Sequence, residues 1–198
     1  MGEHYYSPNP TSAHDARTVS YLFRGRTLRF ETDAGVFSRQ HVDKGTGLLL
    51  AALPERFCGR ALDLGCGWGA VGVCMASCWP EAQVALTDIN ERAVALSRKN
   101  MAANGLRGCV YCGDGLQNVP GRFHLIATNP PIRAGKAVLY PLFAQAIARL
   151  EADGALYLVI RRQQGAESAL KYLRTLADTQ VVARGGGYWV LRASAPAG

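Results

Sequence analysis

The stretch Ala61-Leu62-Asp63-Leu64-Gly65-Cys66-Gly67-Trp68-Gly69 decides how the rest of the chain is interpreted. Its first residues are mostly apolar, as in a buried strand, and three glycines then follow at alternate positions. Glycine lets the backbone turn sharply and approach a ligand closely, and a helix that begins there offers N–H groups without partners in the helix. The stretch therefore predicts a strand, a ligand-binding loop and the start of a helix.

Strands and helices alternate on both sides of this loop. The pattern predicts strands at 60–64, 83–87, 108–112, 123–128 and 155–160 and helices at 70–78, 91–103, 139–150 and 167–176. Two last strands, 180–183 and 188–192, flank Gly185-Gly186-Gly187 and are typical of an antiparallel hairpin. Strand–helix alternation at these lengths implies right-handed crossovers. We expect an α/β fold, a doubly wound and mostly parallel seven-stranded sheet of Rossmann-like type.

A smaller extension precedes this alternation. Polar and apolar residues alternate over 18–23 and 26–32 around Arg24-Gly25, which predicts a small N-terminal β-hairpin. A short lead-in helix is expected over 47–53, with Thr46 as its N-cap residue and Pro54 behind it. We expect one domain over residues 1–198, in which 1–55 form the hairpin and lead-in helix and 56–198 the binding and catalytic core.

Composition and charge exclude several classes of protein. The 198 residues are 48% hydrophobic and 19% charged, without a long apolar run or a signal-like start, so a globular, cytoplasmic protein without membrane contact is expected. Cys109-x-x-Cys112 lacks a second cysteine pair, and we expect thiols and no metal site. The net charge of +7 rests on 18 arginines and 4 lysines. Arginine suits phosphates and stacked bases, but the charge taken alone favours a solvated basic surface that serves solubility.

Three aspartates end successive predicted strands. Asp63, Asp88 and Asp114 are 25 and 26 residues apart, which places them together at the carboxyl edge of the sheet. The glycines with Asp88 also fit a dinucleotide-binding loop. A carboxylate at Asp63 would repel a pyrophosphate, however, and would attract the cationic amino-acid end of S-adenosylmethionine, whose product is S-adenosylhomocysteine. The candidate cofactor residues are Asp63, Gly65, Cys66, Gly67, Asp88, Ile89, Asp114, Gly115 and Asn129.

A second motif, Asn129-Pro130-Pro131, follows the strand predicted at 123–128. Neither proline has an N–H group, and the residue before a proline is extended, so this loop is stiff and rich in acceptors. The Asn129 side-chain oxygen and the Pro130 carbonyl can bind the two hydrogens of a planar exocyclic amine. This arrangement would orient the amine nitrogen toward a methyl donor. We interpret Asn129, Pro130 and Pro131 as the catalytic group.

The order of these motifs carries a family resemblance. DLGCGWG at 63–69, TD at 87–88, GDG at 113–115 and NPPI at 129–132 resemble a class I S-adenosylmethionine-dependent methyltransferase. HYYSPNP at 4–10, RGRTLRFETDAGVFS at 24–38, VDKGT at 42–46 and VIRRQQGAESAL at 159–170 resemble the RsmC-like family of ribosomal RNA guanine-N2 methyltransferases. The resemblance implies that Asp63, Gly65 and Gly67 form the cofactor loop. It also implies a ribose ligand at Asp88, an adenine ligand at Asp114 and a target-amine clamp at 129–131.

The sequence departs from that family at two points. Many amino-methyltransferases carry an aromatic residue after the prolines, which stacks on the target, whereas this chain has Ile132. Phe37 and Tyr140 are the candidates for that stacking role. The best-known family members also carry an additional N-terminal domain, for which 198 residues leave no room, so a single-domain member is expected.

The expected partner is ribosomal RNA or the small ribosomal subunit, not DNA. Arg133 and Lys136 follow the clamp, Arg161 and Arg162 follow the next strand, and further arginines lie on the leading hairpin. The candidate substrate residues are Phe37, Ile132, Arg133 and Lys136. Three alternatives stay open: a methyltransferase for a protein glutamine amide or a small amine, a dinucleotide oxidoreductase, and a noncatalytic RNA-binding module.

Overall fold

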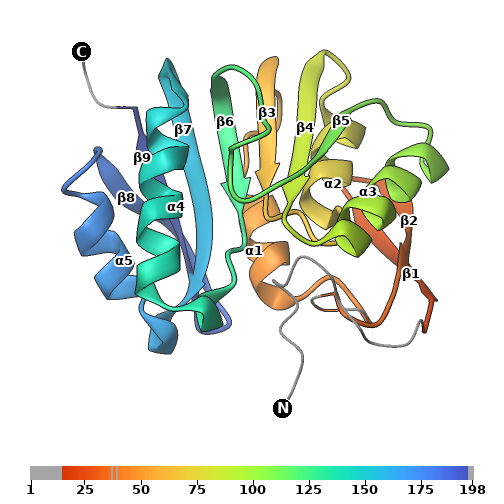
Figure 1. The fold of residues 1–198 in the computed structure, drawn as a ribbon, viewed down its shortest axis with the longest axis horizontal. Helices are drawn as coiled ribbons and strands as arrows, with labels where there is room; N and C mark the ends of the chain where they lie inside the picture. Colours follow the sequence, from red (N-terminus) through yellow and green to blue (C-terminus); the bar gives the residue numbers. More distant parts are fainter. Residues whose placement is uncertain (1–14, 37, 39, 196–198) are drawn as a thin grey trace.

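The computed structural model describes residues 15–36, 38 and 40–195 of the chain (Figure 1). Its centre is a seven-stranded sheet in the order β5-β4-β3-β6-β7-β9-β8. The first five strands in this order are parallel, and β9 runs antiparallel to both β7 and β8. The predicted doubly wound sheet with an antiparallel C-terminal pair is therefore confirmed. The strands are β3 (Gly59–Leu64), β4 (Ala82–Asp88), β5 (Cys109–Cys112), β6 (Phe123–Thr128), β7 (Leu150–Arg161), β8 (Thr179–Gly185) and β9 (Tyr188–Ser194).

Helices cover both faces of this sheet. The buried apolar residues form two clusters, one that joins α1 (Lys44–Ala52), α2 (Ala70–Cys78) and α3 (Glu91–Ala103) to the sheet, and one that joins α4 (Lys136–Ala148) and α5 (Ala166–Leu173) to it. Two short 3₁₀ turns, η1 (Ile132–Ala134) and η2 (Arg162–Gln164), precede α4 and α5. Within the described residues, no helix combines the length and the apolar character that crossing a membrane requires.

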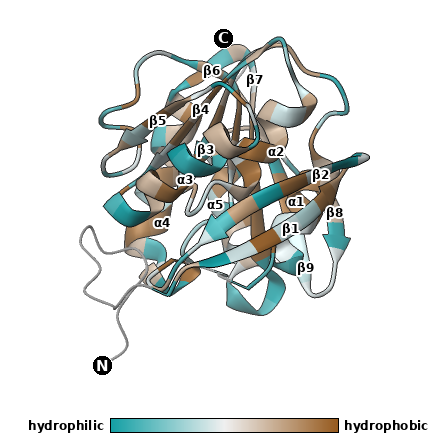
Figure 2. Cartoon of the chain, turned by 90° about the vertical axis from the view of Figure 1, so that its right-hand side faces the viewer, coloured by the Kyte–Doolittle hydropathy of each residue, from teal (hydrophilic) through white to brown (hydrophobic). Residues whose placement is uncertain are grey.

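The N-terminal hairpin is a separate two-stranded sheet, β1 (Arg17–Phe23) and β2 (Arg26–Thr32). Arg24 and Gly25 both have positive φ, at 45° and 79°, which matches the twist of a two-residue hairpin turn. Figure 2 shows the hairpin lying across the outside of the helices, with hydrophobic and hydrophilic residues alternating along its strands. The Arg24 guanidinium donates to the carbonyls of Leu53, Pro54 and Glu55, so it ties the turn to the end of α1.

Two asparagines of α3 hold the edge of β2. Asn100 accepts from the Glu31 N–H at 2.7 Å and donates to the Glu31 carbonyl at 2.9 Å, and Asn104 binds the Arg29 backbone in the same way at 3.0 and 2.7 Å. Asn100 also donates to the Trp68 carbonyl at 2.8 Å, inside the glycine loop. One side chain therefore fixes the hairpin and the loop together.

Two helices begin three residues earlier than the sequence predicts. The prediction that Thr46 caps the lead-in helix is wrong: α1 begins at Lys44, because Asp43 Oδ1 accepts from the N–H groups of Gly45 and Thr46 at 2.8 and 3.2 Å. Helix α4 begins at Lys136, earlier than expected, since Gly135 at φ 81° ends η1 and allows the helix to start directly. Most other elements end within a few residues of their predicted bounds, and β7 extends farthest beyond its predicted range.

Replacing Asn100 tests whether this side chain fastens the hairpin to the core. Asn100→Ala is expected to lower the free energy of unfolding by about 1–3 kcal/mol, because buried backbone groups of Glu31 and Trp68 lose their partners. Urea denaturation followed by circular dichroism measures the change. Asn104→Ala is the matched control and should cost less, since its contacts lie closer to solvent. Equal losses in the two variants would contradict the assignment.

Candidate functional site

A cavity of about 810 Å³ lies at the carboxyl edge of the parallel strands. Its size is within the range of small-ligand and cofactor sites, roughly 300–1,000 Å³. The loops after β3, β4, β5 and β6 line it, together with the start of α1, the first turns of α4 and the beginning of β9. The motifs that the sequence singled out therefore meet in one place, as expected for the ligand edge of an open parallel sheet.

The glycine loop is anchored to the neighbouring strand. Gly65 and Cys66 both donate their N–H groups to the Thr87 carbonyl at 2.9 Å, and Gly67 donates to Asp88 Oδ2 at 2.8 Å. Gly65 and Gly67 have positive φ, and a Cβ atom at either position would meet no protein atom within 4 Å. The loop backbone thus faces open space in the cavity, where a ligand can approach it closely.

Asp63 is the most buried acid of the cavity, with 1% of its surface exposed. Its Oδ2 accepts from the Gly72 N–H of α2 at 2.7 Å. Burial raises the pKa of Asp63 to about 7, although the Gly72 hydrogen bond acts in the opposite direction and Asp88 adds to the increase. The carboxyl group is therefore poised between its neutral and ionised forms near neutral pH, and a cation in the cavity would favour the ionised form.

Asp88 and Asp114 lie farther along the same edge. Asp88 is half-buried, its Oδ1 accepts from the Asn90 N–H at 2.9 Å, and burial raises its pKa against the effect of the backbone hydrogen bonds. Asp114 is exposed at the rim, and Ile89 and Gly115 line the cavity beside the two acids. The three aspartates predicted from their spacing thus share one cavity wall.

Cys66 also lines the cavity, but its side chain is turned toward the protein interior. Its Sγ lies 3.3 Å from Ser97 Oγ, and the residue is 7% exposed. Burial, with the nearby carboxyl groups, raises the pKa of the Cys66 thiol well above its usual range. The neutral thiol is a poor nucleophile, so only its backbone is suited to contact a ligand.

The Asn129 side chain is held by the start of α1. Its Nδ2 donates to Thr46 Oγ1 at 2.9 Å and to Asp43 Oδ2 at 3.2 Å, while the Thr46 hydroxyl donates to the same Asp43 oxygen at 2.5 Å. Both bonds therefore lie on one side of the amide nitrogen and fix the orientation of the amide plane. Among the described residues no donor reaches Asn129 Oδ1, which is left as an acceptor in the cavity that Pro130 and Pro131 also line.

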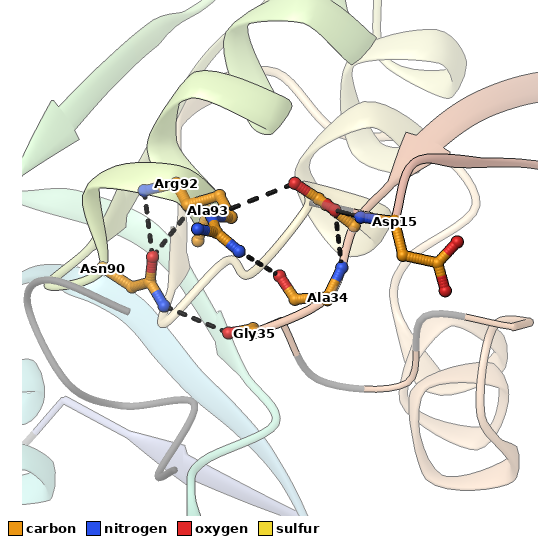
Figure 3. Close-up of polar contacts among 7 residues, drawn as sticks. Asp15, Ala34, Gly35, Asn90, Arg92 and Ala93 are labelled. Atoms are coloured by element: carbon orange, nitrogen blue, oxygen red, sulfur yellow. Dashed lines mark hydrogen bonds and ion pairs between the residues drawn. The ribbon is translucent and has the colours of Figure 1, made fainter. Parts of the chain in front are cut away.

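The loop after β2 forms a further wall, and the N-terminus of α3 holds it in place. Arg92 Nε lies 3.9 Å from Asp33 Oδ2, and Asn90 donates to the Gly35 carbonyl at 3.3 Å (Figure 3). Val36, the next residue, lines the cavity. Because Asn90 also donates its N–H to Asp88, this loop and the acid at the end of β4 are joined through one residue.

The predicted substrate residues are divided between the cavity and its surroundings. Ile132 and Arg133 line the cavity, and Arg133 is exposed. Lys136 is outside its lining and donates to Ser168 Oγ at 3.3 Å. Phe37 lies outside the described residues. Of the two arginines at the end of β7, Arg161 is its last residue and lines the cavity, whereas Arg162, the next residue, is 3.6 Å from Glu167.

Comparison with known proteins gives a family. The profile of the methyltransferase small domain family matches residues 27–192. The protein YbxB of Bacillus subtilis is 40% identical over 98% of both chains. The chain belongs to the methyltransferase small domain family. Ribosomal RNA small subunit methyltransferase C of Pseudomonas entomophila, another member of similar sequence, is 38% identical over 81% of this chain and 49% of its own.

A solved methyltransferase structure has the same fold. The 16S ribosomal RNA N2 G1207 methyltransferase (RsmC) of T. thermophilus, in complex with AdoMet and guanosine, aligns with a TM-score of 0.82 and 29% identity over 93% of this chain and 52% of that one. The chain spans about half the length of the ribosomal RNA methyltransferases that it matches. The class I methyltransferase fold expected from the motif order is confirmed.

Three positions that line the cavity were missed by the motif analysis. Asp43 and Thr46 hold the Asn129 amide although 86 and 83 residues separate them from it. Their signal was the VDKGT stretch, which was interpreted only as part of the resemblance and as a helix cap. Tyr188 lines the cavity from the start of β9, and no local motif marks it.

Proposed function

We propose that the protein transfers a methyl group from S-adenosylmethionine to an exocyclic amino nitrogen, namely guanine N2 of small-subunit ribosomal RNA. The observation that carries the proposal is the Asn129 amide. Its nitrogen donates to Asp43 and Thr46, so its oxygen is presented to the cavity as an acceptor. An amino group, which supplies hydrogens, is the complementary target.

The cavity suits a cationic nucleotide-like cofactor. Asp43, Asp63, Asp88 and Asp114 all contribute to its lining. Four carboxyl groups are unfavourable around the pyrophosphate of a dinucleotide and favourable around a sulfonium and an ammonium group. Asp63 would hold the amino-acid end, Asp88 the ribose and Asp114 the adenine, while Gly65 and Gly67 leave space at the backbone.

The residues of the chain supply position and electrostatic stabilisation. When bound, S-adenosylmethionine supplies an electrophilic methyl group and leaves as S-adenosylhomocysteine. Asn129 Oδ1 and the Pro130 carbonyl accept the two amine hydrogens and draw electron density toward the nitrogen. The proline-fixed loop aims this nitrogen into the cavity, and orientation of reactants can contribute roughly 7–11 kcal/mol. The amine proton becomes acidic only as the nitrogen gains the methyl group, so no residue has to remove it beforehand.

RNA is favoured over a protein amide or a small amine by two observations. The relative from Pseudomonas entomophila is named as a ribosomal RNA methyltransferase, and the solved neighbour was obtained with guanosine. Arg133 and Arg161 place positive charge in the lining of the cavity, where phosphates can bind. A protein glutamine amide or a small amine is the second candidate, because the clamp accepts any planar amino group.

Labelled S-adenosylmethionine identifies the acceptor. Ribosomal RNA and small subunits prepared without this modification are incubated with the protein, and the methylated nucleotide is mapped by mass spectrometry. We expect 2-methylguanosine in the RNA, at a rate that falls steeply as salt rises, because several phosphates are contacted. Label found only in protein or in a small amine would reject the RNA proposal.

The Asn129 clamp predicts a distinct set of kinetic changes. Asn129→Ala should lower kcat by about 100-fold or more, while S-adenosylmethionine binding stays within a few-fold. Thr46→Val removes one acceptor of the Asn129 amide and should lower kcat by at least about tenfold, because the clamp can then rotate. Thr46→Ser retains the hydroxyl and is the control. Loss of cofactor binding in Asn129→Ala, or an unchanged kcat in Thr46→Val, would contradict the clamp.

The raised pKa of Asp63 predicts a pH-dependent cofactor affinity. Below about pH 7 the Asp63 carboxyl of the free protein is neutral and has to release its proton when the cationic cofactor binds. The affinity for the cofactor therefore rises with pH until Asp63 is ionised in the free protein. Above roughly pH 8 the cofactor's own amino group loses its charge and affinity falls. Calorimetry between about pH 5.5 and 8.5 measures both limbs. Asp63→Asn, which can still accept from Gly72, should bind more weakly and lose the acidic limb. A flat profile in the unchanged protein would reject the assignment.

A further inference from the structure

The cavity needs a planar surface for a target base, since Ile132 occupies the position where related enzymes carry an aromatic residue. Among the described residues that line the cavity, Trp68 and Tyr188 are aromatic. Trp68 is 4% exposed and packs edge-to-face on Phe30 at 4.9 Å, so it belongs to the core. Tyr188 is half-buried and can offer part of its ring to a ligand.

The Tyr188 ring lies beside the residues that orient the clamp. A Cβ atom at Gly45 would be 2.9 and 3.0 Å from two carbons of this ring, so the ring is seated directly against the first turn of α1. Gly45 lies between Asp43 and Thr46 in the chain. The side chains of these two residues bind the Asn129 amide. The absence of a side chain at Gly45 is what lets the ring approach the clamp.

A second planar group accompanies the ring. Arg161, the last residue of β7, is the register partner of Tyr188 on β9, and its guanidinium carbon lies 5.6 Å from the ring centre. Guanidinium groups and tyrosine rings both stack on unpaired bases. Arg161 is exposed, and Arg133, also exposed, lines the same cavity and has no acceptor among the described residues.

We infer that Tyr188 and Arg161 form the platform on which the target base stacks while Asn129 and Pro130 hold its amino group. This inference rests on the proposed function, and it places base recognition on the antiparallel end of the sheet rather than next to the two prolines. The juxtaposed ring, guanidinium and free arginine favour a nucleotide over a peptide amide, which offers no ring to stack.

The test replaces the ring and measures base binding directly. 2-Aminopurine riboside carries an exocyclic amine, and stacking quenches its fluorescence. We expect saturable quenching with the unchanged protein and with Tyr188→Phe, and an affinity about 5- to 150-fold weaker with Tyr188→Leu. Tyr140→Leu is the matched control, because Tyr140 stacks on Tyr172 at 4.0 Å and is outside the cavity lining. Quenching retained in Tyr188→Leu would overturn the platform.

Unchanged S-adenosylmethionine binding shows that Tyr188→Leu is folded. If Tyr188→Leu fails to bind the cofactor, Arg161→Gln replaces it in the test, since the Arg161 side chain is exposed and its loss should not disturb folding. Quenching by Arg161→Gln equal to that by the unchanged protein would then overturn the inference. With RNA as acceptor, the loss in Tyr188→Leu should be in KM more than in kcat. Tyr188-dependent quenching without RNA methylation would retain the platform and reject the proposed function. RNA methylation unaffected by Tyr188→Leu would reject the platform alone.

Discussion

Asp63 lies near the end of β3 with its carboxyl group almost completely out of water, and the Gly72 N–H is its hydrogen-bond partner. An isolated buried carboxylate is unfavourable, so the group stays neutral or gains a cation. The same hydrogen bond fixes the first turn of α2 to the end of β3, and therefore the path of the glycine loop between them. One contact thus sets both the shape of the loop and the charge that its ligand has to carry.

The cavity is completed by the N-terminal part of the chain. Thr46 of α1 and its N-cap residue Asp43 bind the Asn129 amide, and the loop after β2 supplies Val36 to the wall. The Arg24 guanidinium ties the hairpin turn to the end of α1, and Asn100 ties β2 to the glycine loop. The described residues of this N-terminal part (15–36, 38 and 40–55) therefore share the core of the sheet and contribute to the site, rather than standing apart as an accessory segment.

Local patterns in the sequence predicted the sheet and the acids at its edge, because strand–helix alternation and carboxyl-edge positions repeat with a regular spacing. They did not predict the partner of Asn129, since Asp43 and Thr46 reach it across 86 and 83 residues. The helix cap was misassigned for a related reason: Thr46 and Asp43 are both good cap residues, and only the folded backbone selects between them. Arg24 is one of the hairpin arginines that were counted toward RNA binding, but its guanidinium donates to carbonyls that follow α1.

The orientation of one amide determines which chemical groups the site can accept. If the Asn129 amide were reversed, its hydrogens would face the cavity and would bind a carbonyl or a hydroxyl oxygen. The Asp43 carboxylate excludes that state, because it accepts hydrogens and cannot donate one to the Asn129 oxygen. Under the proposed function, selection for an amino group therefore comes from Asp43 and Thr46 at the start of α1, outside the Asn-Pro-Pro motif. Selection among amines has to come from the groups around the clamp, which are Ile132, Arg133 and the Tyr188 ring.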